Sequence, residues 1–107
     1  MEVGKFTAEK ILDRRIVFDD GTVVEARAFR IPESKEYPDG IKYSFQHYNP
    51  ETGKTLLRYD NYREHAESRH HKHLGGSKIR PVMFEGLQTH FKKFMKEVRS
   101  DDRRKRP

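Results

Sequence analysis

The pattern of apolar and polar positions in the first sixty residues predicts four β-strands. Segments of strand composition lie at 10–18, 22–31, 41–48 and 54–60. In the third segment Ile41, Tyr43 and Phe45 are separated by polar residues, which is the period of a half-buried strand. Between the first two segments, Asp20 and Gly21 tolerate the positive φ angles that a tight turn requires. The pattern therefore predicts two successive antiparallel hairpins.

The pattern changes to a helical period after Pro81. Apolar residues then recur at spacings of three and four, at Phe84, Leu87, Phe91, Phe94 and Val98. Packing of this stripe on the sheet gives an α+β fold, a four-stranded antiparallel β-meander with a C-terminal α-helix on one face (ββββα). We expect residues 1–99 to form this single domain. The basic segment 100–107 has no apolar residue and is expected to be a disordered tail.

The composition favours an anionic partner and excludes several chemistries. The chain has 23 Lys and Arg against 17 Asp and Glu, a formal net charge of +6 and an isoelectric point near 9.7. Such cations gain affinity for nucleic acid by displacing counterions from phosphates, and they also suit an acidic protein. The absence of cysteine excludes disulfides, thiolate zinc sites and cysteine nucleophiles. No segment has the pattern of a membrane helix or a signal peptide, so we expect a cytoplasmic protein without membrane association.

Histidines gather in a segment without hydrophobic period, from Asn61 to Arg80, which is expected to be a long loop. Four of the six histidines lie there, namely His65, His70, His71 and His73. The other two, His47 and His90, are predicted to be packed or surface residues. An imidazole can give or take a proton near neutral pH, which general acid–base catalysis requires. Cleavage of RNA by its own 2′-hydroxyl needs a base, an acid and a cation but no metal or other cofactor, so the cluster predicts a metal-independent ribonuclease site.

Two other interpretations of the histidines remain open. His71 and His73, with His65 or Asp60 as further ligands, would form a metal site of imidazoles and a carboxylate. Alternatively, the histidines are half-exposed polar residues that bind phosphate or fix the loop. Asp60 either bonds local backbone groups or orients one imidazole, as carboxylates do in many histidine-dependent sites.

Basic and aromatic residues surround the same segment and would contact RNA. The predicted phosphate contacts are Arg58, Arg63, Arg69, Lys72, Lys78 and Arg80. Tyr59 and Tyr62 offer aromatic faces on which an unstacked base could lie. The predicted catalytic residues are His65, His70, His71, His73 and Asp60.

One motif in this region resembles a known family. Residues 58–61 (Arg-Tyr-Asp-Asn), followed by His65 and by residues 70–75 (His-His-Lys-His-Leu-Gly), are similar to the pattern of the TumE family of toxins from prokaryotic type II toxin–antitoxin pairs. The similarity spans residues 10–99. It implies a β-meander with a C-terminal helix, and pairing with a small helix-turn-helix antitoxin.

We therefore expect a toxin that acts on RNA, as a ribonuclease resembling an mRNA interferase. The alternative is a non-catalytic module that uses the same surface to bind a nucleic acid or a protein. Cleavage of RNA distinguishes the two hypotheses. A homodimer is compatible with either of them.

Overall fold

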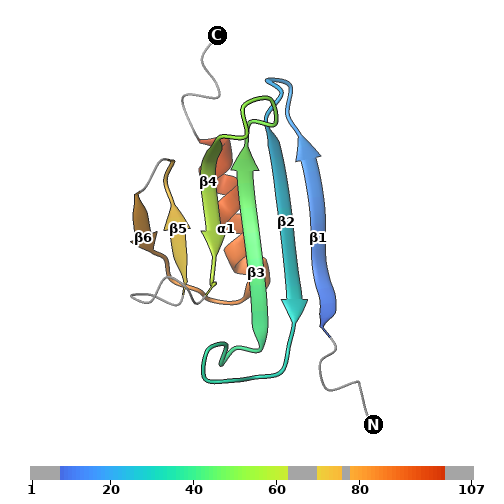
Figure 1. Cartoon of the computed structure of the whole chain (residues 1–107), viewed down its shortest axis with the longest axis vertical. Helices are drawn as coiled ribbons and strands as arrows, with labels where there is room; N and C mark the ends of the chain where they lie inside the picture. Colours follow the sequence, from blue (N-terminus) through green and yellow to red (C-terminus); the bar gives the residue numbers. More distant parts are fainter. Residues whose placement is uncertain (1–7, 63–69, 76–77, 101–107) are drawn as a thin grey trace.

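The strands form an antiparallel meander and the helix lies behind it (Figure 1). The computed structural model describes residues 8–62, 70–75 and 78–100. The elements are β1 (Glu9–Val17), β2 (Val23–Arg30), β3 (Ile41–Tyr48), β4 (Thr55–Asp60), β5 (His71–His73), β6 (Ile79–Pro81) and α1 (Leu87–Arg99). Each strand pairs antiparallel with the next, so the spatial order of the sheet follows the chain.

The two faces of the sheet have different environments, because successive residues in a strand point to opposite sides. Ala26, Phe45 and Tyr59 are register partners across β2, β3 and β4, and their buried side chains lie on the face that α1 covers. We call this the helix face. Arg58 and Asp60 alternate with Tyr59 and point to the opposite face, which we call the open face.

The core lies between the helix face and α1. Its buried residues are Val24, Ala26, Ala28, Tyr43, Phe45, Leu57, Tyr59, Phe94, Met95 and Val98. The Phe94 ring meets those of Phe45 and Tyr59 edge to face, at centroid distances of 5.6 and 5.1 Å. Edge-to-face contacts of this kind add to the stabilisation that comes from burying the rings. The apolar stripe of the helix is thus a packing surface.

The structure confirms the α+β fold, with four main strands and a C-terminal helix. The segment 61–80, which we expected to be a loop, also contains the short strands β5 and β6. Each has three residues, and β5 is entirely polar, so hydrophobic patterning could not reveal it. The helix begins at Leu87, and Phe84 packs against the core from the segment that precedes it.

Two further expectations concern the tail and the membrane. Ser100 caps α1, because its N–H donates to the carbonyl of Lys96 at 3.1 Å, and the rest of the predicted tail lies outside the described residues. In the described part of the chain, no helix is long and apolar enough to cross a membrane.

Candidate functional site

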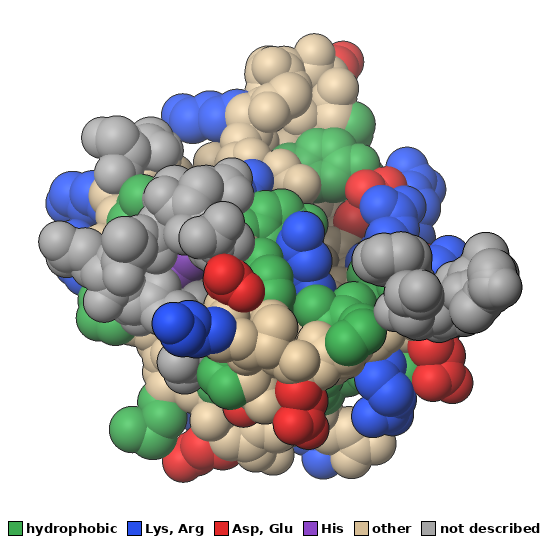
Figure 2. Space-filling model, turned by 60° about the horizontal axis from the view of Figure 1, so that its bottom comes forward, with side chains coloured by type: hydrophobic (Ala, Val, Ile, Leu, Met, Phe, Trp, Pro, Cys, Tyr) green, Lys and Arg blue, Asp and Glu red, His purple; other side chains and the backbone are tan. Residues whose placement is uncertain are grey.

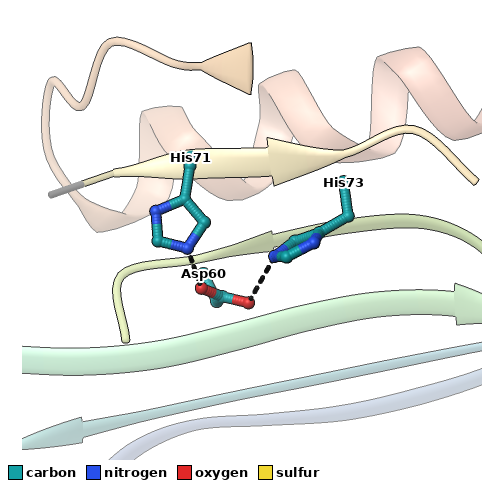
Figure 3. A group of neighbouring side chains, drawn as sticks. All are labelled: Asp60, His71 and His73. Atoms are coloured by element: carbon teal, nitrogen blue, oxygen red, sulfur yellow. Dashed lines mark ion pairs between the residues drawn. The ribbon is translucent and has the colours of Figure 1, made fainter. Parts of the chain in front are cut away.

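A buried carboxylate meets two imidazoles on the open face, where β4 pairs with β5. The register pairs Asp60 with His71 and Arg58 with His73, so these four side chains share one face. Figure 3 shows the rings of His71 and His73 pointing from β5 toward the Asp60 carboxylate on β4. We call Asp60, His71 and His73 the His–Asp cluster.

The contacts within the His–Asp cluster are short. Nε2 of His71 lies 2.7 Å from Oδ1 of Asp60, and Nε2 of His73 lies 3.3 Å from Oδ2. The side chains of Asp60 and His71 are buried, at 0% and 1% exposure, whereas that of His73 is 16% exposed. Asp60 therefore orients both rings, and His73 is the histidine of this cluster that can contact another molecule.

Two further groups hold the Asp60 carboxylate. Nε of Arg58 donates to Oδ2 at 2.7 Å, and the backbone N–H of Tyr62 donates to Oδ1 at 3.2 Å. A carboxylate away from water needs donors of this kind to replace its hydration. Asp60 is the last residue of β4, and the chain beyond it returns the Tyr62 amide to the carboxylate. Asp60 thus accepts from a local backbone N–H and also contacts both imidazoles of the cluster.

A cavity of about 370 Å³ gives access to His73. Its lining residues are Lys54, Thr55, Arg58, His73 and Gly75. Gly75 has a φ of 62°, a left-handed conformation that glycine adopts without strain. The cavity therefore combines an imidazole with an ammonium and a guanidinium group, which together suit a phosphate.

His70 lies apart from the His–Asp cluster, on the helix side of the sheet. Its ring stacks on Phe84 at a centroid distance of 4.4 Å. Its Nδ1 lies 3.0 Å from the Tyr43 hydroxyl, and its Nε2 lies 3.1 Å from Oδ2 of Asp39. The same hydroxyl lies 2.8 Å from Nε2 of His90. These contacts form a polar chain from the partly exposed Asp39 into the core, which we call the Tyr43 chain.

Burial shifts the pKa values of two members of the Tyr43 chain, His90 and Tyr43. It lowers the pKa of His90 from 6.5 to about 3, and the charges of Lys93 and His70 act in the same direction. Burial also raises the pKa of Tyr43, with the negative charge of Asp60 adding to the effect. His90 and Tyr43 are therefore neutral at physiological pH, and the chain anchors the residue that precedes β5.

The other residues predicted to contact RNA are spread over the structure. Lys72 points to the helix face, where its Nζ lies 3.3 Å from both carboxylate oxygens of Glu97. Lys78 lies just before β6 and Arg80 lies within it, and both side chains are exposed. Tyr62 joins the site through its backbone N–H. His65, Arg63 and Arg69 lie outside the described residues.

Several residues around these groups were not singled out from the sequence, namely Asp39, Tyr43, Lys54 and Glu97. Asp39 precedes Gly40 in a turn pattern, and Tyr43 was assigned only to the strand alternation. The available signal was the inward-facing tyrosine itself, because a buried hydroxyl usually requires a polar partner. His47 and His90, predicted to be packed or surface residues, are both fully buried.

The His–Asp cluster also has the donors of a metal site. One ligand atom each from Asp60, His71 and His73 lies within 4.8 Å of the others. Two imidazoles and a carboxylate suit zinc and related transition metals. The guanidinium of Arg58 opposes a cation there, because it lies against the same carboxylate. The geometry is thus compatible with proton transfer and with metal binding.

Fold and site together define a small α+β protein with a His–Asp cluster where β4 and β5 meet. A family model described as Toxin TumE matches residues 6–102, and the chain therefore belongs to the TumE toxin family. This confirms the family indicated by residues 58–61 and 70–75. Membership in a toxin family implies an antitoxin as partner. Comparisons with curated proteins and with solved structures found no match.

Proposed function

We propose that this TumE toxin is the toxin of a type II toxin–antitoxin pair and cleaves RNA, without a metal, by proton transfer at His73. One observation carries the proposal. The imidazole of His73, oriented by Asp60, lines a cavity that also contains the cations of Lys54 and Arg58. Because the other histidine of the cluster is buried, the proposal assigns the contact with RNA to His73.

A phosphodiester in this cavity would meet the groups that cleavage requires. With the Nε2 proton of His73 directed to Asp60, Nδ1 is the unprotonated nitrogen and accepts the proton of the 2′-hydroxyl. The 2′ oxygen then bonds to phosphorus, and the bond from phosphorus to the 5′ oxygen breaks. Lys54 and Arg58 stabilise the charge that develops on the phosphate oxygens. The leaving 5′ oxygen takes a proton from water, and His73 later returns its proton to water.

Asp60 and His71 are positioning residues in this proposal. The buried ring of His71 contacts Oδ1 of Asp60, and Oδ2 of the same carboxylate contacts the ring of His73. His70 supports the start of β5 from the other side of the sheet. The remaining sequence predictions stay predictions: His65 as a catalytic residue, and Arg63, Arg69, Lys72, Lys78 and Arg80 as phosphate contacts.

Cleavage of labelled single-stranded RNA in the presence of EDTA tests the proposal. We expect the wild type to leave a 2′,3′-cyclic phosphate, and His73→Ala to lower the rate roughly 100-fold or more, the usual contribution of an acid–base group. Lys54→Ala should weaken cleavage as well. Lys96→Ala is the matched control, because it removes an exposed lysine from α1, and should cleave like the wild type. A wild-type rate in His73→Ala would refute the proposal.

A metal-dependent reaction is the second candidate, favoured by the three donor atoms within 4.8 Å of one another. In that case EDTA abolishes cleavage and addition of a single transition metal restores it. RNA that is bound but never cleaved, under either condition, would favour the non-catalytic module.

A further inference from the structure

A second cavity lies on the open face, beside the His–Asp cluster. Its volume is about 620 Å³, within the range of small-molecule sites. Six of its lining residues carry the argument: Arg27, Phe29, Ile31, Lys42, Gln46 and Tyr62. Figure 2 shows a hollow in which apolar (green) and cationic (blue) side chains lie together. We infer that this cavity binds one nucleobase of single-stranded RNA and its adjoining phosphate, an inference that rests on the proposed function.

The lining has the chemistry of a base site. Phe29 and Ile31 supply apolar surface, and Tyr62 supplies an aromatic ring. Bases stack on aromatic side chains irrespective of sequence, because every base has a π-face. Gln46 lines the same cavity; its Nε2 donates one N–H to Oγ1 of Thr55 at 2.7 Å, and its second N–H and its carbonyl oxygen remain to meet a base edge.

A cation for the adjoining phosphate lies beside the aromatic ring. Nζ of Lys42 lies 4.8 Å from the centroid of the Tyr62 ring. Within residues 8–62, 70–75 and 78–100, no ion pair between Lys42 and a carboxylate is found. The other cation of the cavity, Arg27, is paired, because its Nε lies 3.7 Å from Oδ1 of Asp13. The Lys42 ammonium therefore contacts an aromatic ring and no carboxylate among the described residues. A phosphate bound in the cavity would interact with this charge more strongly than the ring does. This charge favours a nucleotide over an uncharged apolar ligand.

The cavity also lies close enough to His73 to hold the nucleotide next to the one that reacts. Gln46 is the register partner of Arg58, which is the partner of His73, so two strand spacings of about 4.8 Å separate the cavity edge from His73. Tyr62 links the two sites directly, since its side chain lines the cavity and its N–H donates to Asp60. A base held here directs its backbone toward the reacting histidine.

Binding of mononucleotides to the full chain tests the inference without requiring cleavage. In a nuclear magnetic resonance titration with AMP, GMP, CMP and UMP, we expect shifts at the amides of Phe29, Lys42 and Tyr62. Tyr62→Ala and Phe29→Ala should each weaken nucleotide binding about tenfold, the usual scale for loss of a stacking contact. Tyr48→Ala, at the far end of β3, is the matched control. Ribose 5-phosphate, which lacks a base, should bind more weakly and be insensitive to both aromatic changes.

The outcomes separate this inference from the proposed function. Nucleotide binding at these amides in a protein that never cleaves RNA would support the base site and refute the proposed function. Cleavage without such binding would refute the base site alone. Nucleotides that bind no better than ribose 5-phosphate would also overturn it, as would an antitoxin that shifts these amides where nucleotides do not. The wild-type titration gives this answer even if a variant fails to fold.

Discussion

The low pKa of His90 should make the folded protein less stable in mild acid. The ring is fully buried, and its Nε2 contacts the Tyr43 hydroxyl at 2.8 Å. With His70 donating its Nε2 proton to Asp39, Nδ1 of His70 accepts from that hydroxyl, which then accepts the Nε2 proton of His90. Nδ1 of His90 finds no hydrogen-bond partner among the described residues, so a proton added there would be buried without an acceptor.

The pKa of His90 gives the sign and size of the effect. Burial lowers this pKa from 6.5 to about 3, so below pH 6.5 the unfolded chain binds a proton that the folded chain refuses. The free energy of unfolding is therefore unaffected by His90 above pH 6.5 and decreases as the pH falls from 6.5 toward 3. The linkage relation gives a loss of about 2 kcal/mol at pH 5 and about 4 kcal/mol near pH 3.

Urea unfolding at pH 7 and pH 5 measures this loss. The total change with pH includes contributions from the whole chain, so the informative quantity is the difference between the wild type and His90→Gln, which has no group to protonate at this position. Between the two pH values the wild type should lose about 2 kcal/mol more than the variant. Equal losses in the two proteins would refute the reasoning, because His90 would then have an ordinary pKa in the folded state.

Three further changes test other parts of the structure. Tyr59→Phe removes the hydroxyl that donates to Oε1 of Glu97 at 2.6 Å and should cost about 1 kcal/mol of stability, whereas an unchanged urea midpoint would mean that this bond contributes nothing. Phe94→Ala empties a fully buried position and should cost about 3–5 kcal/mol in thermal unfolding, and a cost below about 1 kcal/mol is incompatible with the described packing of α1. Asp60→Ala leaves Arg58 and two imidazoles without their carboxylate. It should cost about 3 kcal/mol in urea unfolding and relieve growth arrest in bacteria that express the chain without its antitoxin, and unchanged stability together with unchanged arrest speaks against a role for Asp60.

The sequence predicts the parts of the fold that bury apolar surface. Strand β3 is found where Ile41, Tyr43 and Phe45 alternate with polar residues, and α1 where Phe91, Phe94 and Val98 follow the helical period. Strand β5 buries no apolar side chain, and its position follows from backbone pairing with β4 and from the contacts that Asp60 makes. Those are long-range interactions, which a local pattern does not contain.

The histidine segment shows why a candidate site is harder to predict than a fold. Adjacent residues of an extended chain point to opposite faces, so His70 and His71, though neighbours in sequence, belong to different clusters. By the same rule Lys72 faces away from the carboxylate and pairs with Glu97 on the helix. The composition of the segment indicated imidazoles and cations, but only the strand assignment separates them into two groups.

Chemical rescue tests the assignment of His73 most directly. Replacing His73 by alanine opens the cavity lined by Lys54 and Arg58 to small molecules, so added imidazole can occupy the vacated position beside Asp60. The account predicts that imidazole restores part of the RNA cleavage lost in His73→Ala and leaves Lys54→Ala unchanged. A His73→Ala protein that cleaves as fast as the wild type, or one that stays inactive at every imidazole concentration, would show that the reacting group lies elsewhere.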